Sequence, residues 1–118
     1  MPLLKLETSI ERPEFEAREE FQKISTSILS EEIGKSSNFV MVVQSFNCSI
    51  SFGMDSARPV AFLEIKNVGS LSSEVTQNLS KRLCELCRDQ FSIPPDRIYL
   101  EFQESARSHW GWNGKTFQ

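Results

Sequence analysis

The sequence is poor in the side chains that most often build metal centres and disulfide frameworks. Its 118 residues include three cysteines and one histidine, His109. An odd number of thiols cannot pair completely, so we expect them to be reduced and the protein to be intracellular. Because no histidine–cysteine cluster exists, the sequence predicts no metal site.

Excess positive charge and long apolar segments are also missing. The formal net charge is −3, whereas nucleic-acid-binding domains carry clustered basic residues, so we expect no nucleic-acid partner. No apolar run approaches the roughly 20 residues of a membrane span. Glu7, Glu11 and Arg12 interrupt the N-terminal segment before the apolar stretch of a signal peptide could form. These features predict a cytoplasmic protein without a membrane partner.

The pair Cys84 and Cys87 has the spacing of a redox motif. It falls inside a helical pattern rather than at a helix start, where a thiolate would be stabilised. We therefore interpret both cysteines as packing residues.

Residues 1–118 read as one domain built from two similar halves. Each half predicts strand, helix and strand, and equivalent strands are offset by roughly 57–58 residues. The predicted strands span residues 3–10, 39–43, 60–66 and 98–103, and the predicted helices span 13–33 and a segment that begins at Ser72 or Ser73.

Apolar stripes and stop signals support the two helices. Gly34 and the Pro94-Pro95 pair mark their ends. The stripes are Ala17, Phe21, Ile24 and Ile28 in the first helix and Val75, Leu79, Leu83, Leu86 and Cys87 in the second. Duplicated β-α-β units predict an α/β (α+β) fold, a four-stranded mixed sheet with two helices on one face.

The run Phe39–Val43 places apolar side chains on both faces of a strand. Leaving Phe39, Met41 and Val43 in water would forfeit roughly 1.5–3 kcal/mol each. We therefore expect a further subunit to cover the sheet face that the helices leave open.

The two ends of the chain carry the remaining signals. Removal of Met1 would make Pro2 a free secondary amine, and burial would move its pKa toward neutrality, as proton-transfer catalysis requires. At the other end, residues 110–117 hold three aromatic side chains, which predicts a docked tail rather than a disordered one.

The chain resembles the macrophage migration inhibitory factor family, which includes D-dopachrome tautomerase. The resemblance covers essentially the whole chain. It is carried by Met1-Pro2-Leu3, Gly34-Lys35, Ser51-Phe52-Gly53, Asn67-Val68-Gly69, Asp96-Arg97-Ile98-Tyr99 and the segment Gly111–Phe117.

This resemblance implies a homotrimer with active sites at the subunit interfaces. It implies cofactor-free keto–enol tautomerisation, an isomerase activity, on phenylpyruvate-like α-keto acids and, in some relatives, on dopachrome derivatives. Vertebrate members are also cytokines that are exported without a signal peptide. A receptor partner would follow if this protein were exported.

The resemblance also assigns roles to residues. Pro2 matches the general base, Lys35 the lysine that binds the substrate carboxylate or enolate oxygen, and Val68 a residue whose backbone N–H binds substrate. Tyr99 matches a tyrosine supplied by the adjacent subunit. Trp110 and Phe117 match apolar residues that line the pocket mouth, and Phe39 stands where some members of the family carry a tyrosine.

Two positions depart from the best-known member of the family. Glu101 stands where that member has a substrate-contacting asparagine, and a carboxylate there would raise the pKa of the Pro2 amine and repel anionic substrates. The segment Arg58–Ala61 holds no cysteine, so no thiol oxidoreductase role is implied. We expect an altered substrate preference or weakened activity.

Other interpretations of these patterns stay open. Lys35 could be a solvated charge at a helix end, and Tyr99 an interface tyrosine without a catalytic role. Arg107 is a hypothetical anion-binding residue. The whole protein could act as a cytokine-like receptor ligand with a vestigial site, or as a ferredoxin-like binding module, although the acidic charge argues against RNA.

Overall fold

The structure, a computed structural model, describes all 118 residues. The chain forms two β-α-β units followed by a short C-terminal hairpin. The elements are β1 (Pro2–Thr8), α1 (Phe15–Ile33), η1 (Ser37–Phe39), β2 (Met41–Ser45), β3 (Ala61–Val68), α2 (Ser73–Phe91), η2 (Pro95–Arg97), β4 (Ile98–Ser105), η3 (Arg107–His109), β5 (Gly111–Trp112) and β6 (Lys115–Thr116).

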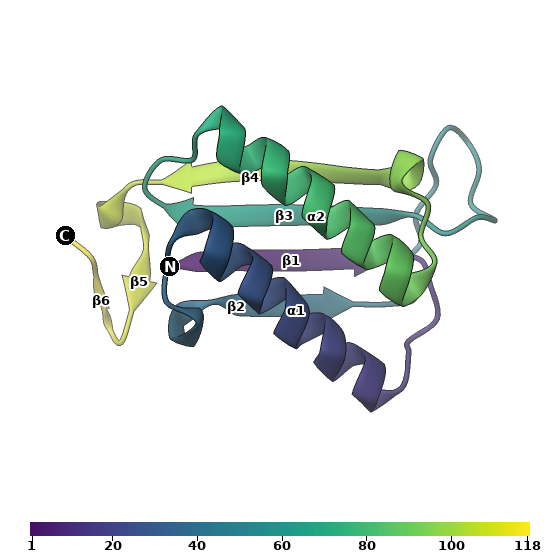
Figure 1. Cartoon of the computed structure of the whole chain (residues 1–118), viewed down its shortest axis with the longest axis horizontal. Helices are drawn as coiled ribbons and strands as arrows, with labels where there is room; N and C mark the ends of the chain where they lie inside the picture. The colour runs from purple at the N-terminus through teal and green to yellow at the C-terminus, as the bar shows by residue number, and fades with distance from the viewer.

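The four long strands form one mixed sheet in the order β2-β1-β3-β4. β1 pairs in parallel with β2, β3 pairs in parallel with β4, and the two units join through the antiparallel pair β1–β3. Both helices lie on the same face of the sheet (Figure 1). The predicted fold is therefore confirmed, including the repeat.

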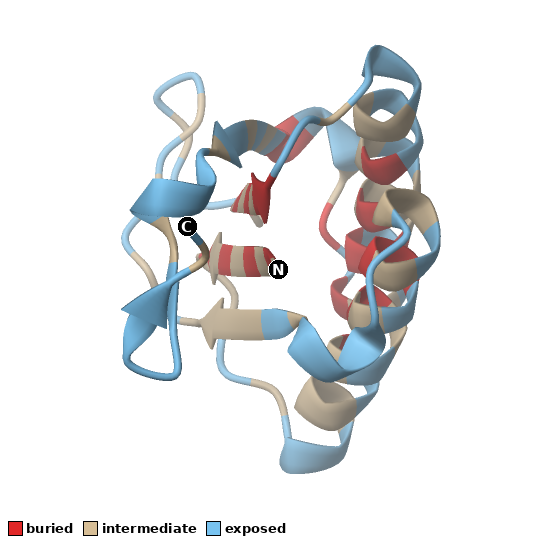
Figure 2. Ribbon diagram, turned by 90° about the vertical axis from the view of Figure 1, so that its left-hand side faces the viewer, coloured by how far each residue is buried: buried red, intermediate tan, exposed pale blue.

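The core lies between this face and the helices. Side chains alternate along β1, so that Leu4 and Leu6 are fully buried while Leu3, Lys5 and Glu7 point to the open face. Figure 2 shows the sheet from its end, with buried residues on the strands and on the helix surfaces that face them. The open face carries no helix.

The predicted helix signals hold with one correction. α1 begins at Phe15 rather than at Pro13, and its N-cap Glu14 makes no side-chain cap. Gly34 ends α1 in the left-handed conformation that glycine favours, at φ 76°. Ser72 caps α2, because its side chain accepts a hydrogen bond from the Val75 N–H.

The second strand differs more from its prediction. β2 begins at Met41, and Phe39 belongs to the short helical turn η1. The cause is local: the Ser36 side chain accepts a hydrogen bond from the Asn38 N–H and folds the chain into that turn. Met41 is 62% exposed on the open face, whereas Val42 packs on the core, so β2 does carry apolar groups on both sides.

The aromatic tail is ordered as the β5–β6 hairpin, two strands that the sequence pattern did not predict. The hairpin lies beside the N-terminal end of β1, close to η1 (Figure 1). The Phe39 and Trp112 rings meet edge to face with centroids 5.6 Å apart. The tail therefore docks on its own subunit at the end of the sheet where the chain begins.

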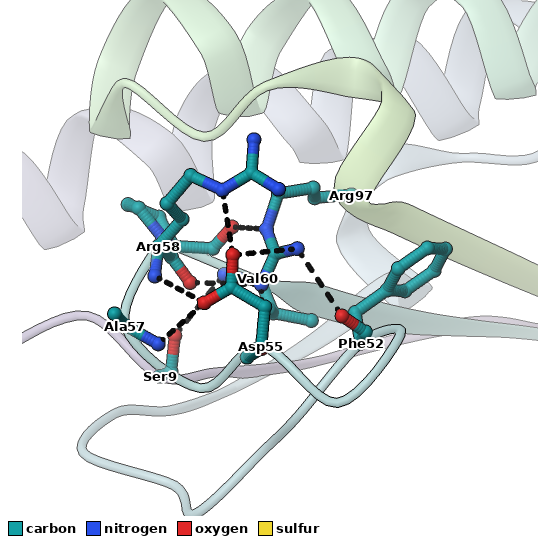
Figure 3. Close-up of polar contacts among 8 residues, drawn as sticks. Ser9, Phe52, Asp55, Ala57, Arg58, Val60 and Arg97 are labelled. Carbon is teal, nitrogen blue, oxygen red and sulfur yellow. Dashed lines mark hydrogen bonds and ion pairs between the residues drawn. The ribbon is translucent and has the colours of Figure 1, made fainter.

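A buried arginine organises the loop between β2 and β3. Arg97 is 3% exposed and donates to backbone carbonyls of this loop (Figure 3). The acceptors are the carbonyl oxygens of Pro59 at 2.9 Å, Asp55 at 2.9 Å, Arg58 at 3.1 Å and Phe52 at 3.4 Å. The loop is thus fixed to the start of β4.

Two expectations from the sequence concern the helices: that none crosses a membrane, and that Cys84 and Cys87 are packing residues. Neither helix is long and apolar enough to cross a membrane. In α2, Cys87 is fully buried, and burial together with Cys84 raises the pKa of its thiol to about 12. Burial also raises the pKa of the Cys84 thiol. Both thiols therefore stay protonated, in keeping with packing rather than redox chemistry.

Candidate active site

A pocket of about 260 Å³ opens at the end of the sheet where the chain begins. The end of α1, the turn η1, the end of β3 and the C-terminal hairpin surround the N-terminus there (Figure 1). The pocket is lined by Met1, Lys35, Ser36, Phe39, Val68, Arg107 and Phe117. Four of the residues predicted for the site, Lys35, Phe39, Val68 and Phe117, thus come together beside the N-terminus.

The N-terminal amino group belongs to Met1 in this structure, and the Pro2 nitrogen is an amide. Burial lowers the pKa of this amino group, and the positive charge of Lys35 lowers it further. Pro2 lies one residue deeper, fully buried in β1 opposite Asn67 of β3.

Lys35 owes its position to the end of α1. The left-handed Gly34 turns the chain out of the helix, and the Ser30 hydroxyl donates to the Lys35 carbonyl at 2.6 Å. The Gly34 turn and this hydrogen bond together fix the Lys35 backbone where the helix meets the pocket. Its ammonium charge is close enough to the N-terminal amine to affect its pKa.

Val68 is the last residue of β3. It is buried, and its register partner on β4 is Ser105. The following N–H, that of Gly69, donates to the Ser105 carbonyl at 3.2 Å, so the end of the strand is held in the sheet. Val68 thereby contributes an apolar wall and a rigid backbone to the pocket.

Arg107 and Phe117 hold each other across the opening of the hairpin. The Arg107 Nη2 donates to the Phe117 carbonyl at 2.7 Å, and the Phe117 N–H donates to the Arg107 carbonyl at 3.2 Å. This pair places the Phe117 ring and the Arg107 guanidinium in the same pocket. The sequence offered Arg107 only as a hypothetical anion-binding residue.

A second hollow of about 360 Å³ adjoins the first, since Met1 and Phe39 line both. Pro2 and Trp110 line this second hollow rather than the first, together with Trp112. Sequence reasoning gave no role to Trp112, although the aromatic content of the tail was a signal for it. The two hollows form a cationic compartment and an apolar compartment around the N-terminus.

Tyr99 and Glu101 are not brought to this pocket. Both lie on β4 and point to the open face of the sheet, where Tyr99 is 66% exposed. The Tyr99 ring contacts Phe52, with centroids 5.1 Å apart. Phe52 is in turn held by Arg97, whose guanidinium lies 5.6 Å from the ring centroid. These residues could reach a pocket only on another subunit.

The pocket contains an amine whose pKa is lowered by burial and by Lys35, the Lys35 cation itself and apolar walls. Such a site can remove a proton from an acidic carbon and stabilise the negative oxygen that forms. No three side chains among histidine, cysteine, aspartate and glutamate gather closely enough to hold a metal ion.

Comparison with known proteins gives a consistent family signal. A family model described as macrophage migration inhibitory factor matches residues 1–118. The chain is 28% identical to the macrophage migration inhibitory factor of Rattus norvegicus over 117 residues, which cover 99% of each protein. It is 30% identical to that of Xenopus tropicalis over 92 residues, which cover 78% of this chain and 79% of the relative.

Solved structures of proteins of the same family are also similar to this chain. A macrophage migration inhibitory factor homologue from Prochlorococcus marinus superposes with a TM-score of 0.90 at 31% identity, covering 98% of this chain and 99% of that one. A macrophage migration inhibitory factor-like protein from Entamoeba histolytica superposes with a TM-score of 0.84 at 30% identity. This match covers 98% of this chain and 96% of that one. The similarity extends over both β-α-β units and the tail.

Proposed function

Because the chain belongs to the macrophage migration inhibitory factor family, we propose that it is a cofactor-free keto–enol tautomerase of phenylpyruvate-like α-keto acids, with Pro2 as general base. The observation that carries this proposal is the convergence of the N-terminus, Lys35 and Val68 on one pocket. Dopachrome-type compounds are further candidate substrates.

The proposed reaction moves one proton. The neutral Pro2 amine takes a proton from the carbon beside the keto group, and the electron pair of that C–H bond moves toward the keto oxygen. Lys35 and the Val68 backbone N–H stabilise the oxyanion. The Pro2 ammonium then returns the proton to this oxygen, which gives the enol, and the reverse sequence gives the ketone.

Removal of Met1 is part of the proposal, since only a free Pro2 nitrogen can act as a base. The effect of the site on the amino group of Met1 indicates what Pro2 would experience. Burial and Lys35 both disfavour the charged amine. Both effects favour the neutral amine, which is the form that accepts a proton.

We propose that the active unit is a homotrimer in which Tyr99 and Glu101 enter the pocket of an adjacent subunit. The open sheet face supports this assembly, since it exposes Met41 and Tyr99 to 62% and 66%. Covering such side chains stabilises an assembly by roughly 1.5–3 kcal/mol each. Glu101 would place a carboxylate near the Pro2 amine and raise its pKa.

A second candidate function is cytokine-like signalling through a receptor. The whole-chain similarity to the rat macrophage migration inhibitory factor favours it. It would require export from the cell, and the cytoplasm remains the proposed principal location. A Pro2→Gly variant that loses turnover but keeps receptor binding would show that the two functions are independent.

Subunit complementation tests the proposed catalytic unit. Pro2→Gly and Tyr99→Ala proteins are each expected to be nearly inactive on phenylpyruvate. When they are unfolded together and refolded, some sites combine an intact Pro2 with an intact Tyr99, and part of the activity should return. Mixing without unfolding is the control. Refolded mixtures that stay inactive, although each variant alone refolds and assembles, would contradict the proposal that two subunits share each active site.

A further inference from the structure

We infer that this site selects α-keto acids that carry a second anionic group, and that Arg107 is the residue that binds it. The inference rests on the proposed tautomerase function. It starts from the charges of the pocket: Lys35 and Arg107 both line it, and none of its lining residues is acidic. Two cations without an acidic partner among the lining residues can bind two anionic groups.

The two cations enter the pocket from different elements. Lys35 follows α1, whereas Arg107 begins η3 next to the C-terminal hairpin. Figure 1 shows these two elements on opposite sides of the N-terminus. Of the two, Lys35 is the one whose charge lowers the pKa of the N-terminal amine. The reacting end of a substrate therefore belongs beside Lys35, and its far end beside Arg107.

Most N–H donors of the Arg107 guanidinium are available to a ligand. A guanidinium carries five N–H donors, and the hydrogen bond to the Phe117 carbonyl uses one on Nη2. That bond also fixes the side chain, so less rotational freedom is lost when an anion binds. The remaining N–H groups can hold a carboxylate in a two-point contact, which is the geometry that favours arginine over lysine.

The apolar surroundings separate the two charges. Phe39, Val68 and Phe117 line the same pocket. An aryl or alkyl spacer between the keto acid and the second carboxylate would contact these side chains, while each end meets a cation. A 4-carboxyphenylpyruvate has this arrangement, and phenylpyruvate is the same molecule without the second anion.

The test compares these two compounds on wild-type protein and Arg107→Gln. Glutamine retains an N–H donor for the Phe117 carbonyl but has no charge. We expect wild-type protein to prefer 4-carboxyphenylpyruvate to phenylpyruvate. Arg107→Gln should raise the KM for 4-carboxyphenylpyruvate about 10- to 100-fold. The KM for phenylpyruvate and both kcat values should change less than about threefold. Lys115→Gln, which removes an exposed tail cation outside the pocket, is the matched control.

A binding measurement separates this inference from the tautomerase proposal. Calorimetry with 4-carboxycinnamate and cinnamate, which have no keto group to tautomerise, reports the second anion alone. We expect tighter binding of the dicarboxylate and loss of that preference in Arg107→Gln, even if no turnover is found. Equal affinities in wild-type protein would overturn the inference. Equal affinities are the result expected if Glu101 of a neighbouring subunit already pairs with Arg107. A preference that survives Arg107→Gln would also overturn the inference, because another group would then bind the second anion.

Discussion

Pro2 and Asn67 lie opposite each other in the antiparallel pair of β1 and β3. Asn67 is 1% exposed, and its Oδ1 has no hydrogen-bond partner. With Met1 attached, the Pro2 nitrogen has no N–H to offer. The residue beside the proposed base is therefore a buried amide whose acceptor is unsatisfied, and such a group costs stability.

Replacing this amide should stabilise the form that retains Met1. Asn67→Leu exchanges the side chain for an apolar one of similar volume, and we expect the free energy of unfolding to rise by about 1–2 kcal/mol. Urea denaturation measures it. Thr8→Val is a control with the opposite expected effect. The Thr8 hydroxyl donates to the Val60 carbonyl at 2.7 Å, so the loss of this hydrogen bond should lower the free energy of unfolding. A decrease for Asn67→Leu would refute the prediction.

The pH dependence of turnover should respond to Lys35. The positive charge of Lys35 lowers the pKa of the N-terminal amine, so Lys35→Gln should raise the pKa of that group. The base must be neutral to act, and the acid limb of kcat/KM should therefore move to higher pH. Lys23→Gln, which changes an exposed lysine within α1, the helix that Lys35 follows, should leave the limb in place. A limb that does not move in Lys35→Gln would contradict the assigned cause.

Arg97 should contribute strongly to stability. Arg97→Met removes the donors to several loop carbonyls, and we expect a loss of about 3 kcal/mol in the free energy of unfolding. The exposed Arg88→Met should change it by less than about 0.5 kcal/mol. The NMR resonances of the Tyr99 ring give a second measurement. They should shift in Arg97→Met, because Phe52 contacts both Tyr99 and Arg97. Unchanged resonances would show that Tyr99 is positioned otherwise.

Glu101 should limit activity on substrates with a single anion. Glu101→Asn removes a carboxylate that, in the proposed trimer, faces both the amine and the substrate. We expect a higher kcat/KM for phenylpyruvate and a lower pKa for the acid limb. Parallel steady-state assays at several pH values measure both. Kinetics identical to those of the parent would mean that Glu101 does not reach the site.

The sequence predicted the scaffold of the pocket well because the scaffold depends on local signals. Gly34 ends α1, Ser72 begins α2, and strand alternation buries Leu4 and Leu6. These features depend on neighbours within a few residues. The resemblance to a known family then implied that Lys35 and Val68 lie at one site, although many residues separate them in the chain.

Contacts between distant segments were not predictable in the same way. The hydrogen bonds of Arg97 to the loop before β3 leave no periodic pattern, and neither does the contact of Phe39 with Trp112. The turn η1 was missed because five apolar residues favoured a strand over a weak serine cap. Tyr99 and Glu101 do not line the pocket of their own chain, so the roles proposed for them depend on the proposed trimer.

Turnover of phenylpyruvate tests the central claim most directly. Purified protein whose N-terminal mass shows that Met1 has been removed should interconvert the enol and keto forms without added metal or cofactor. Pro2→Gly should abolish this activity while the fold and the assembly persist. Full activity in Pro2→Gly, or no activity in a correctly processed and folded wild-type protein, would contradict the account.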